Sequence, residues 1–204
     1  IIYDKCKTKA HNKHCLRNPN CFCNRKIANT LYMSIRNNFE WIIYCDVDEF
    51  ITTKKNINNT IKKELKKTFK NVDCIKIPWV MMGCNKKKLN PESVLLENTY
   101  RWNQDIRHNY NKRLNKFRCR YDTIECKCIF KAKIFEKIID HHPLTPVKQY
   151  VSVNSINKKR AKVSKFYNNL REYDIKNGYL LCYHYRIISI EHCKHKLNEI
   201  GKDL

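Results

Sequence analysis

The sequence predicts an α/β fold, in which a sheet is flanked by helices, for this chain of 204 residues. Two amphipathic helical patterns are each followed by a continuous apolar run, first within residues 24–47 and again within residues 58–82. Helices that alternate with strands of this kind are typical of α/β layer architectures. The length and the 42% hydrophobic content are sufficient for a real core, so we expect residues 1–204 to form a single domain.

The first helix and strand lie between Asn24 and Val47. From Asn24 to Phe39, apolar residues recur at every fourth position, which predicts an amphipathic helix with this stripe toward the core. Trp41–Val47 is an aromatic and β-branched run of the kind found in strands buried on both faces. The stripe consists of Ile27, Leu31, Ile35 and Phe39.

A second helix and strand follow the same order. Residues 58–70 predict a helix, and Cys74–Met82 predicts a second apolar strand. Residues 83–125 are polar and irregular, and a loop of that length in a compact domain is usually functional or poorly ordered. The apolar face of the second helix consists of Ile61, Leu65 and Phe69.

The C-terminal third predicts further ordered elements. Residues 126–140 read as a strand that runs into a short helix, which the "HHP" sequence at 141–143 ends. Gly178–Tyr185 reads as a strand. Ser189 is then expected to cap the N-terminus of a closing helix, with Glu191 near its positive end.

The charge balance is strongly basic, with 42 Lys and Arg against 19 Asp and Glu and a net charge of +23. Such a field ordinarily points to a polyanionic partner. Here the charge is spread evenly along a chain rich in Lys, Asn and Ile, as codon bias would also produce, so no specific nucleic-acid partner is expected. Neither GxGxxG nor GxxxxGK[ST] occurs, which disfavours dinucleotide-binding and Walker-type proteins.

No apolar run is long enough to cross a bilayer. The chain begins with Ile1, so we interpret it as a fragment or processed form. Membrane attachment is accordingly expected only through a segment absent from this chain.

Twelve cysteines favour an oxidising compartment with disulfides, hence a Golgi or other secretory location, although a cytoplasmic or viral enzyme with free thiols is the alternative. Zinc is the competing explanation for Cys21-x-Cys23 and Cys126-x-Cys128, but structural zinc sites prefer a longer spacing. Spacing alone does not give the disulfide connectivity. The cysteines are at 6, 15, 21, 23, 45, 74, 84, 119, 126, 128, 182 and 193.

The acidic turn after the first strand is the main candidate site. Asp46 and Asp48 are two apart, so in extended backbone both side chains would point to the same side. At the carboxyl end of a buried strand they would reach the crevice where open α/β sheets bind ligands, and two carboxylates suit Mg²⁺ or Mn²⁺ with substrate phosphates. The alternatives are a solvated turn or a cap made by Asp48. Adjacent carboxylates fit glycoside hydrolysis poorly.

The segment "NRKIANTLYMSIRNNFEWIIYCDVDEFI" at 24–51 resembles the helix, Trp, apolar strand and D-x-DEF signature of family 92 glycosyltransferases and their family 2-like relatives. Later blocks of that family are similar to segments of this chain in the same order, so that the resemblance covers roughly residues 24–197. These blocks are "IKIPWVMMG" at 75–83, Arg101, "KCIF" at 127–130, His141 with His142, and "HYRIISIEHCKHK" at 184–196.

The resemblance implies a GT-A-like, Rossmann-like mixed sheet flanked by helices. It also implies that Asp46 and Asp48 hold Mn²⁺ or Mg²⁺ on the diphosphate of a nucleotide-sugar donor, with His184 as a further metal ligand. A hydrogen-bonded structural role is the alternative for His184. Arg101 and Lys127 match basic positions that would steady the donor phosphates, unless they are solvated loop charges.

On the acceptor side, the resemblance points to the strand end at Trp79, Met82 and Gly83, where an aromatic ring would stack on a sugar, although a core Trp is the alternative. Glu49 is expected to point away from both aspartates and to be structural. An inverting reaction needs a general base, and the sequence does not rank the candidates. They are Asp105, Glu125, His141 and His142.

The expected function is that of an inverting, metal-dependent hexosyltransferase that moves a sugar from a UDP- or GDP-sugar to a hydroxyl acceptor, such as a glycan. Residues 1–40 leave room for only part of the donor-side region that the family carries before its acidic motif, so this part is expected to be truncated. Residues 84–124 would form a long acceptor-side loop region. The alternatives are a basic module that binds nucleic acid or an anionic surface, and a degenerate, non-catalytic transferase domain.

Overall fold

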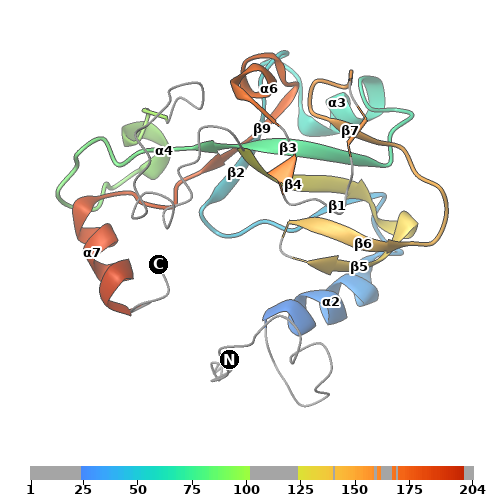
Figure 1. Ribbon diagram of the computed structural model, residues 1–204, viewed down its shortest axis with the longest axis horizontal. Helices are drawn as coiled ribbons and strands as arrows, with labels where there is room; N and C mark the ends of the chain where they lie inside the picture. Colours follow the sequence, from blue (N-terminus) through green and yellow to red (C-terminus); the bar gives the residue numbers. More distant parts are fainter. Residues whose placement is uncertain are drawn as a thin grey trace.

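The computed structural model describes residues 24–101, 124–139, 141–158, 160–161, 167–168 and 170–199. Within these ranges the protein is a mixed α/β fold with a curled sheet and helices around it (Figure 1). The elements, in chain order, are α2 (Asn24–Ile35), β1 (Trp41–Ile43), β2 (Glu49–Thr53), α3 (Ile61–Lys67), β3 (Cys74–Met81), α4 (Val94–Glu97), β4 (Ile124–Lys131), η1 (Ala132–Ile134), β5 (Phe135–Ile139), β6 (His142–Pro146), β7 (Ser152–Asn154), β8 (Tyr167–Asn168), α6 (Glu172–Asn177), β9 (Leu180–His184) and α7 (Ile190–Glu199).

The main sheet has the strand order β1-β4-β3-β9-β2, with β7 also paired to β3 and β8 to β4. β3 runs parallel to β9 and to β7, whereas its pairing with β4 is antiparallel. β1 with β4 and β2 with β9 are antiparallel as well. The prediction of an α/β fold with a mixed sheet is therefore confirmed, and β5 with β6 forms a separate two-stranded sheet.

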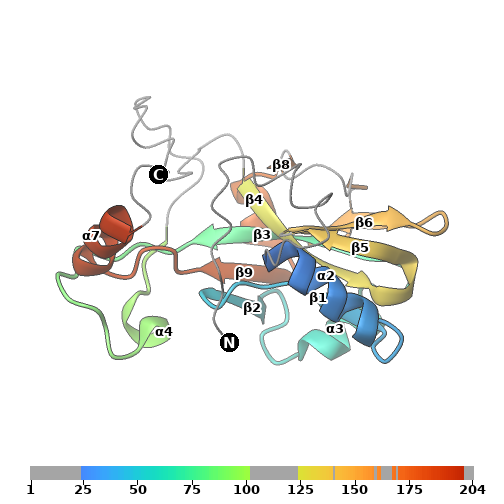
Figure 2. The ribbon, with the colours of Figure 1, turned by 90° about the horizontal axis from the view of Figure 1, so that it is seen from below.

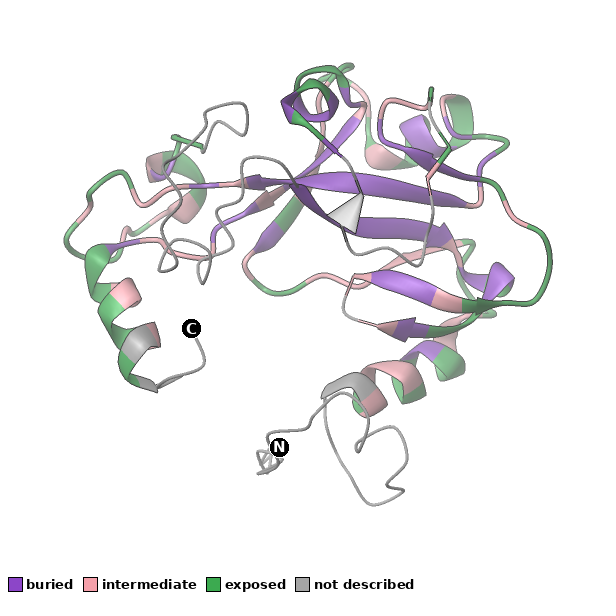
Figure 3. Cartoon of the chain, viewed as in Figure 1, coloured by how far each residue is buried: buried purple, intermediate pink, exposed green. Residues whose placement is uncertain are grey.

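The long strands β3 and β4 form the centre of the core. Both are buried along their whole length except for the last residue of each, as Figure 3 shows by their colour. The second helix packs against them as predicted, because Leu65 is 8% exposed and Phe69 is fully buried. α3 begins after Thr60, whose hydroxyl accepts a hydrogen bond from the Lys63 N–H.

The first helix forms, but the prediction of its buried face was wrong. Leu31 is 58% and Phe39 53% exposed, whereas Tyr32 is buried. The Tyr32 hydroxyl contacts the carbonyl oxygens of Ala132 and Phe135, both at 2.6 Å. These hydrogen bonds fix which face of α2 meets the β5 region, and they turn the aliphatic stripe outward.

The first strand is shorter and less buried than predicted. β1 ends at Ile43 and all three of its residues are only partly buried. Among the described strands it pairs with β4 alone, so within this part of the chain it is an edge strand. Val47, expected inside a buried strand, is fully exposed.

The segment after β4 also differs from the prediction. A short 3-10 turn, η1, leads into β5 and then β6, where a short helix ending at the histidines was expected. β5 buries Phe135 and Ile138 and exposes the residues between them, which suits a strand packed on one side. The predicted irregular region overlaps α4, and its residues 102–123 lie outside the described ranges.

The C-terminal elements agree with the prediction. β9 spans Leu180–His184, and the Ser189 hydroxyl accepts the His192 N–H at 2.9 Å, so Ser189 caps α7. Glu191 lies in the first turn of that helix. Among the helices of the described ranges, none is long and apolar enough to cross a membrane.

No disulfide forms among the described cysteines, so the predicted disulfides are not found there. The same ranges contain no group of three or more His, Cys, Asp or Glu that could hold a metal ion, which also applies to the zinc hypothesis for Cys126 and Cys128. Cys21 and Cys23 lie outside the described residues, as do Cys6, Cys15 and Cys119.

Candidate active site at the acidic turn

The acidic turn crosses from one edge of the sheet to the other. β1 and β2 lie at opposite ends of the strand order, and residues 44–48 connect them (Figures 1 and 2). The Glu49 N–H donates to the Asp46 carbonyl oxygen at 3.2 Å, which closes a turn over these four residues. The expected extended backbone was therefore wrong, and Asp46 and Asp48 meet different strands.

Asp46 meets Lys127 of β4. Lys127 Nζ lies 3.0 Å from Asp46 Oδ2 and 3.1 Å from Glu49 Oε2. The lysine side chain is fully buried, while that of Asp46 is 50% exposed. Burial acts to lower the pKa of Lys127, but the charges of Glu49 and Asp46 outweigh it and the pKa is raised.

Glu49 does not point away from the turn, as had been expected. Its Oε2 accepts the Asp46 N–H at 2.9 Å and shares Lys127 with the Asp46 carboxylate. Its side chain is fully buried, and burial raises its pKa despite these partners. Glu49 and Lys127 thus hold the turn from its buried side. The Lys127 side chain is not exposed to solvent, so it is not positioned to contact a donor phosphate directly.

Asp48 meets β9 and α7. Its Oδ2 lies 3.5 Å from His184 Nε2 and 3.9 Å from Lys196 Nζ. The hydrogen bond with His184 lowers the pKa of Asp48, and the charge of Lys196 acts in the same direction. The Asp48 backbone is held as well, because its carbonyl oxygen accepts the Tyr185 N–H at 2.9 Å.

Trp79 contacts both His184, the partner of Asp48, and Lys127, the partner of Asp46. Its ring centroid is 4.3 Å from that of His184 and 4.8 Å from that of His141. Lys127 Nζ lies 5.8 Å from the same ring. Trp79 is only 3% exposed, which favours the alternative of a core residue over stacking on an acceptor sugar.

The structure takes Arg101 away from this cluster. Its guanidinium forms a two-pronged ion pair with Glu172 of α6, whose side chain is fully buried. A buried carboxylate requires such a partner, so the pairing explains Arg101 without a phosphate. Gly83 lies next to the Met82–Arg101 bridge and donates its N–H to the Tyr100 carbonyl oxygen at 2.9 Å.

The base candidates are separated by their burial. Glu125 on β4 is 6% exposed and His142 on β6 is 7% exposed, so both side chains are buried. His141 is partly exposed and contacts Trp79. Asp105 lies outside the described residues.

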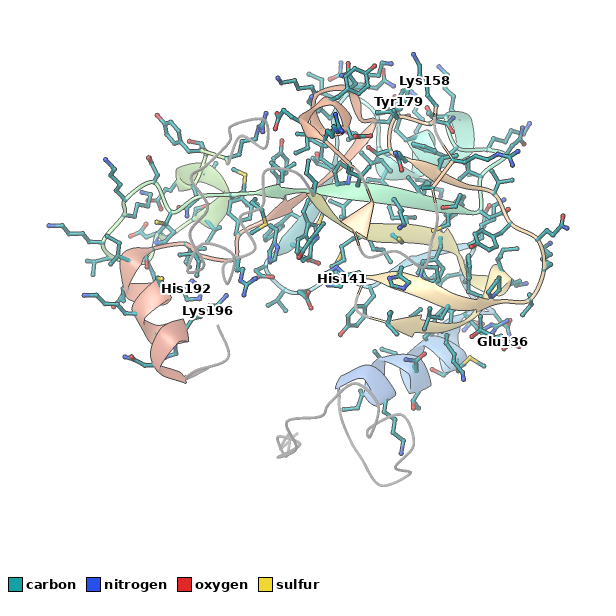
Figure 4. All side chains as sticks on the ribbon, viewed as in Figure 1. Glu136, His141, Lys158, Tyr179, His192 and Lys196 are labelled. Atoms are coloured by element: carbon teal, nitrogen blue, oxygen red, sulfur yellow. The ribbon has the colours of Figure 1, made fainter. Side chains whose placement is uncertain are left out.

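Two basic residues of α7 were missed in the sequence. His192 and Lys196 are one helical turn apart, on the side of α7 that faces the sheet (Figure 4). Lys196 Nζ donates to the Arg186 carbonyl oxygen at 2.7 Å besides approaching Asp48, and burial lowers its pKa. The spacing of four residues was a signal that these two side chains share a face.

The donor chemistry of the turn fits a hard divalent cation. Asp46 and Asp48 provide two partly exposed carboxylates, with side chains 50% and 30% exposed, and His184 Nε2 is adjacent to Asp48. Mg²⁺ is commonly bound by one or two carboxylates together with substrate phosphates and water, so a preformed three-ligand cluster is not required. If the turn binds such an ion, Asp46, Asp48 and His184 are the residues that would hold it, and no group of three such ligands is already assembled among the described residues.

Comparison of the chain with protein-family models gives no match, and a search of curated proteins finds no relative.

Proposed function

We propose that this protein is a metal-dependent glycosyltransferase of the GT-A type, which transfers a sugar from a nucleotide-diphosphate donor to a hydroxyl acceptor. One observation carries the proposal. Asp46 pairs with Lys127 and Asp48 pairs with His184, and both Lys127 and His184 lie against one buried ring, Trp79. The residues that the resemblance assigns to the donor diphosphate are thus linked through shared contacts. A solvated acidic turn would have no reason to be fixed by a fully buried lysine.

In this proposal the side chains have distinct tasks. Asp46 and Asp48 hold the cation through their exposed oxygens, with His184 beside Asp48. The cation, when bound, neutralises charge that develops on the leaving diphosphate. Lys127 and Glu49 keep the turn in position. Lys196 lies near the Asp48 carboxylate, and its positive charge complements a phosphate.

Calorimetric titration with a panel of UDP- and GDP-sugars, with and without Mn²⁺, tests the proposal. We expect at least one donor to bind only with Mn²⁺, and Asp46→Asn and Asp48→Asn each to abolish that binding. Glu136→Gln is the matched control, because Glu136 is an exposed carboxylate on β5 away from the turn (Figure 4). It should bind as the wild type does.

Three results would separate the alternatives. Absence of binding across the panel, or binding unaffected by both substitutions, would overturn the proposal. Salt-sensitive binding of a polyanion such as RNA that survives Asp46→Asn and Asp48→Asn would favour the basic binding module instead. Donor binding without release of the nucleotide diphosphate would favour a non-catalytic domain.

A further inference from the structure

His141 contacts β4 just beyond the residues that pair with β1. β1 pairs only with Ile129–Lys131 of β4, and its register, continued by three residues, would bring Asp46 opposite Cys126. The chain turns away instead. The Cys126 carbonyl oxygen is contacted by His141 Nδ1 at 3.1 Å. His141 is thus bonded to the edge of β4 along which the acidic turn departs.

This contact defines the tautomer of His141. A carbonyl oxygen can only accept, so Nδ1 must carry the proton in the hydrogen bond. In the neutral imidazole the lone pair is then on Nε2. A histidine whose Nδ1–H is held by a fixed acceptor and whose Nε2 takes a proton has the arrangement of a general base.

The position of His141 also suits such a role. The ring centroids of His141 and His184 both lie within 5 Å of the Trp79 centroid. His141 therefore packs against the same ring as His184, the proposed metal ligand. The reacting sugar carbon is attached to the diphosphate, and the attacking hydroxyl must approach it near that point. Glu125 and His142 are buried, so an acceptor hydroxyl reaches them less readily than it reaches the partly exposed His141.

We propose that His141 is the general base of the transfer reaction, an inference that rests on the proposed function. The acceptor oxygen forms a bond to the anomeric carbon while the bond from that carbon to the diphosphate oxygen breaks. The bonding electrons leave with the diphosphate. The hydroxyl proton passes to His141 Nε2, and the imidazolium later returns it to solvent.

The test uses the full chain, the UDP- and GDP-sugars of the panel, and water as the acceptor hydroxyl, with release of nucleotide diphosphate as the readout. His141→Ala is expected to keep donor affinity within about twofold and to lower the release rate by about 10²- to 10⁴-fold. Added imidazole should restore part of the rate to this variant. His141→Gln, whose amide can still donate to the Cys126 carbonyl oxygen, should also be slow, and exposed His195→Ala should match the wild type.

The outcomes separate this assignment from the proposed function. Failure of the wild type to bind any donor would overturn both. A wild type that releases diphosphate, with His141→Ala and His141→Gln releasing it equally fast, would overturn only the assignment of His141. Loss of donor binding in both His141 variants without a change in thermal unfolding would also overturn it, because a base acts on the chemical step.

Discussion

Lys127 joins β4 to the acidic turn, because its buried ammonium lies 3.0 Å from Asp46 Oδ2 and 3.1 Å from Glu49 Oε2. The two carboxylates and one ammonium leave a net negative charge at the turn. Only Asp46 of the three extends to solvent, since the side chains of Lys127 and Glu49 are fully buried. The same contact that fixes the turn therefore directs its remaining negative charge toward solvent, where the proposed cation would bind.

Removal of the Lys127 charge should destabilise the fold strongly. In Lys127→Met, the buried Glu49 carboxyl group loses its cationic partner, and breaking a buried pair in this way costs about 3–5 kcal/mol. Urea denaturation at pH 7 measures the loss. Lys131→Met is the matched control, because the Lys131–Asp73 pair is partly exposed and should contribute about 1 kcal/mol or less.

A double substitution identifies the cause. If Glu49 is the group left uncompensated, Lys127→Met with Glu49→Gln should lose clearly less stability than the sum of the two single changes. Additive losses, or equal losses for Lys127→Met and Lys131→Met, would contradict the central role of this ion pair.

Arg101 should matter for stability rather than for donor binding. Arg101→Lys keeps the charge but loses the two-pronged contact with Glu172, so the melting temperature should fall. Arg101→Ala removes this ion pair from the buried Glu172 carboxylate and should cost about 3–5 kcal/mol. Thermal unfolding and donor titration of Arg101→Lys together check this. A large loss of donor affinity with an unchanged melting temperature would instead support the predicted role of Arg101 in donor binding.

The strands show what the sequence could predict about the fold. Cys74–Met82 and Trp41–Val47 look alike as apolar runs, yet β3 is central and β1 is at an edge. β4 pairs with both strands, so the difference depends on β9 and β7, which give β3 its further neighbours and come much later in the chain. Local periodicity contains no information about such a distant neighbour.

The first helix shows a second limit. The regular stripe through Leu31 was the stronger apolar signal, but Tyr32, one position away, is the buried residue. Its hydroxyl meets carbonyl oxygens of residues 132 and 135, about a hundred positions later in the chain. A polar anchor of that kind overrides an aliphatic stripe, and only the tertiary structure reveals it.

For the candidate site, the members were easier to predict than their contacts. The resemblance brought Asp46, Asp48, Lys127 and His184 together as a set. It did not predict that Lys127 pairs with Asp46 or that His184 pairs with Asp48. Lys196 was missed because a lysine in a basic helix resembles any solvated charge until the facing carboxylate is known.

The buried Glu64 should make stability depend on acid pH. Burial acts to raise the pKa of Glu64, but hydrogen bonds from Asn59, Thr68 and Asn56 outweigh it, and the pKa is lowered. A carboxylate with a lowered folded-state pKa stabilises the fold above its unfolded pKa of about 4.3, and this contribution is lost as the pH falls through the folded value.

Glu64→Gln tests this relation. At pH 7 the variant should be less stable by about 1–3 kcal/mol, because a neutral amide replaces a charged acceptor. The difference from the wild type should shrink as the pH falls from about 4.3 through the lowered folded-state pKa, since the unfolded and then the folded wild type bind the proton. Urea denaturation at a series of pH values measures it, and a difference independent of pH would contradict the explanation.

Cys45 reports on the same turn through its reactivity. Burial, and secondarily the charge of Glu49, raises its pKa to about 11. At pH 8 only about one thiol in a thousand is then the reactive thiolate. We expect iodoacetamide to modify Cys45 much more slowly than Cys84, a partly buried free thiol outside the acidic turn, as peptide mass mapping would show.

Two controls test the cause. In 8 M urea the two rates should converge, and Glu49→Gln should accelerate the reaction of Cys45 in the folded protein. Equal rates for the two cysteines in the folded wild type would mean that Glu49 and the core do not enclose Cys45, and that the turn is looser than its contacts with Lys127 indicate.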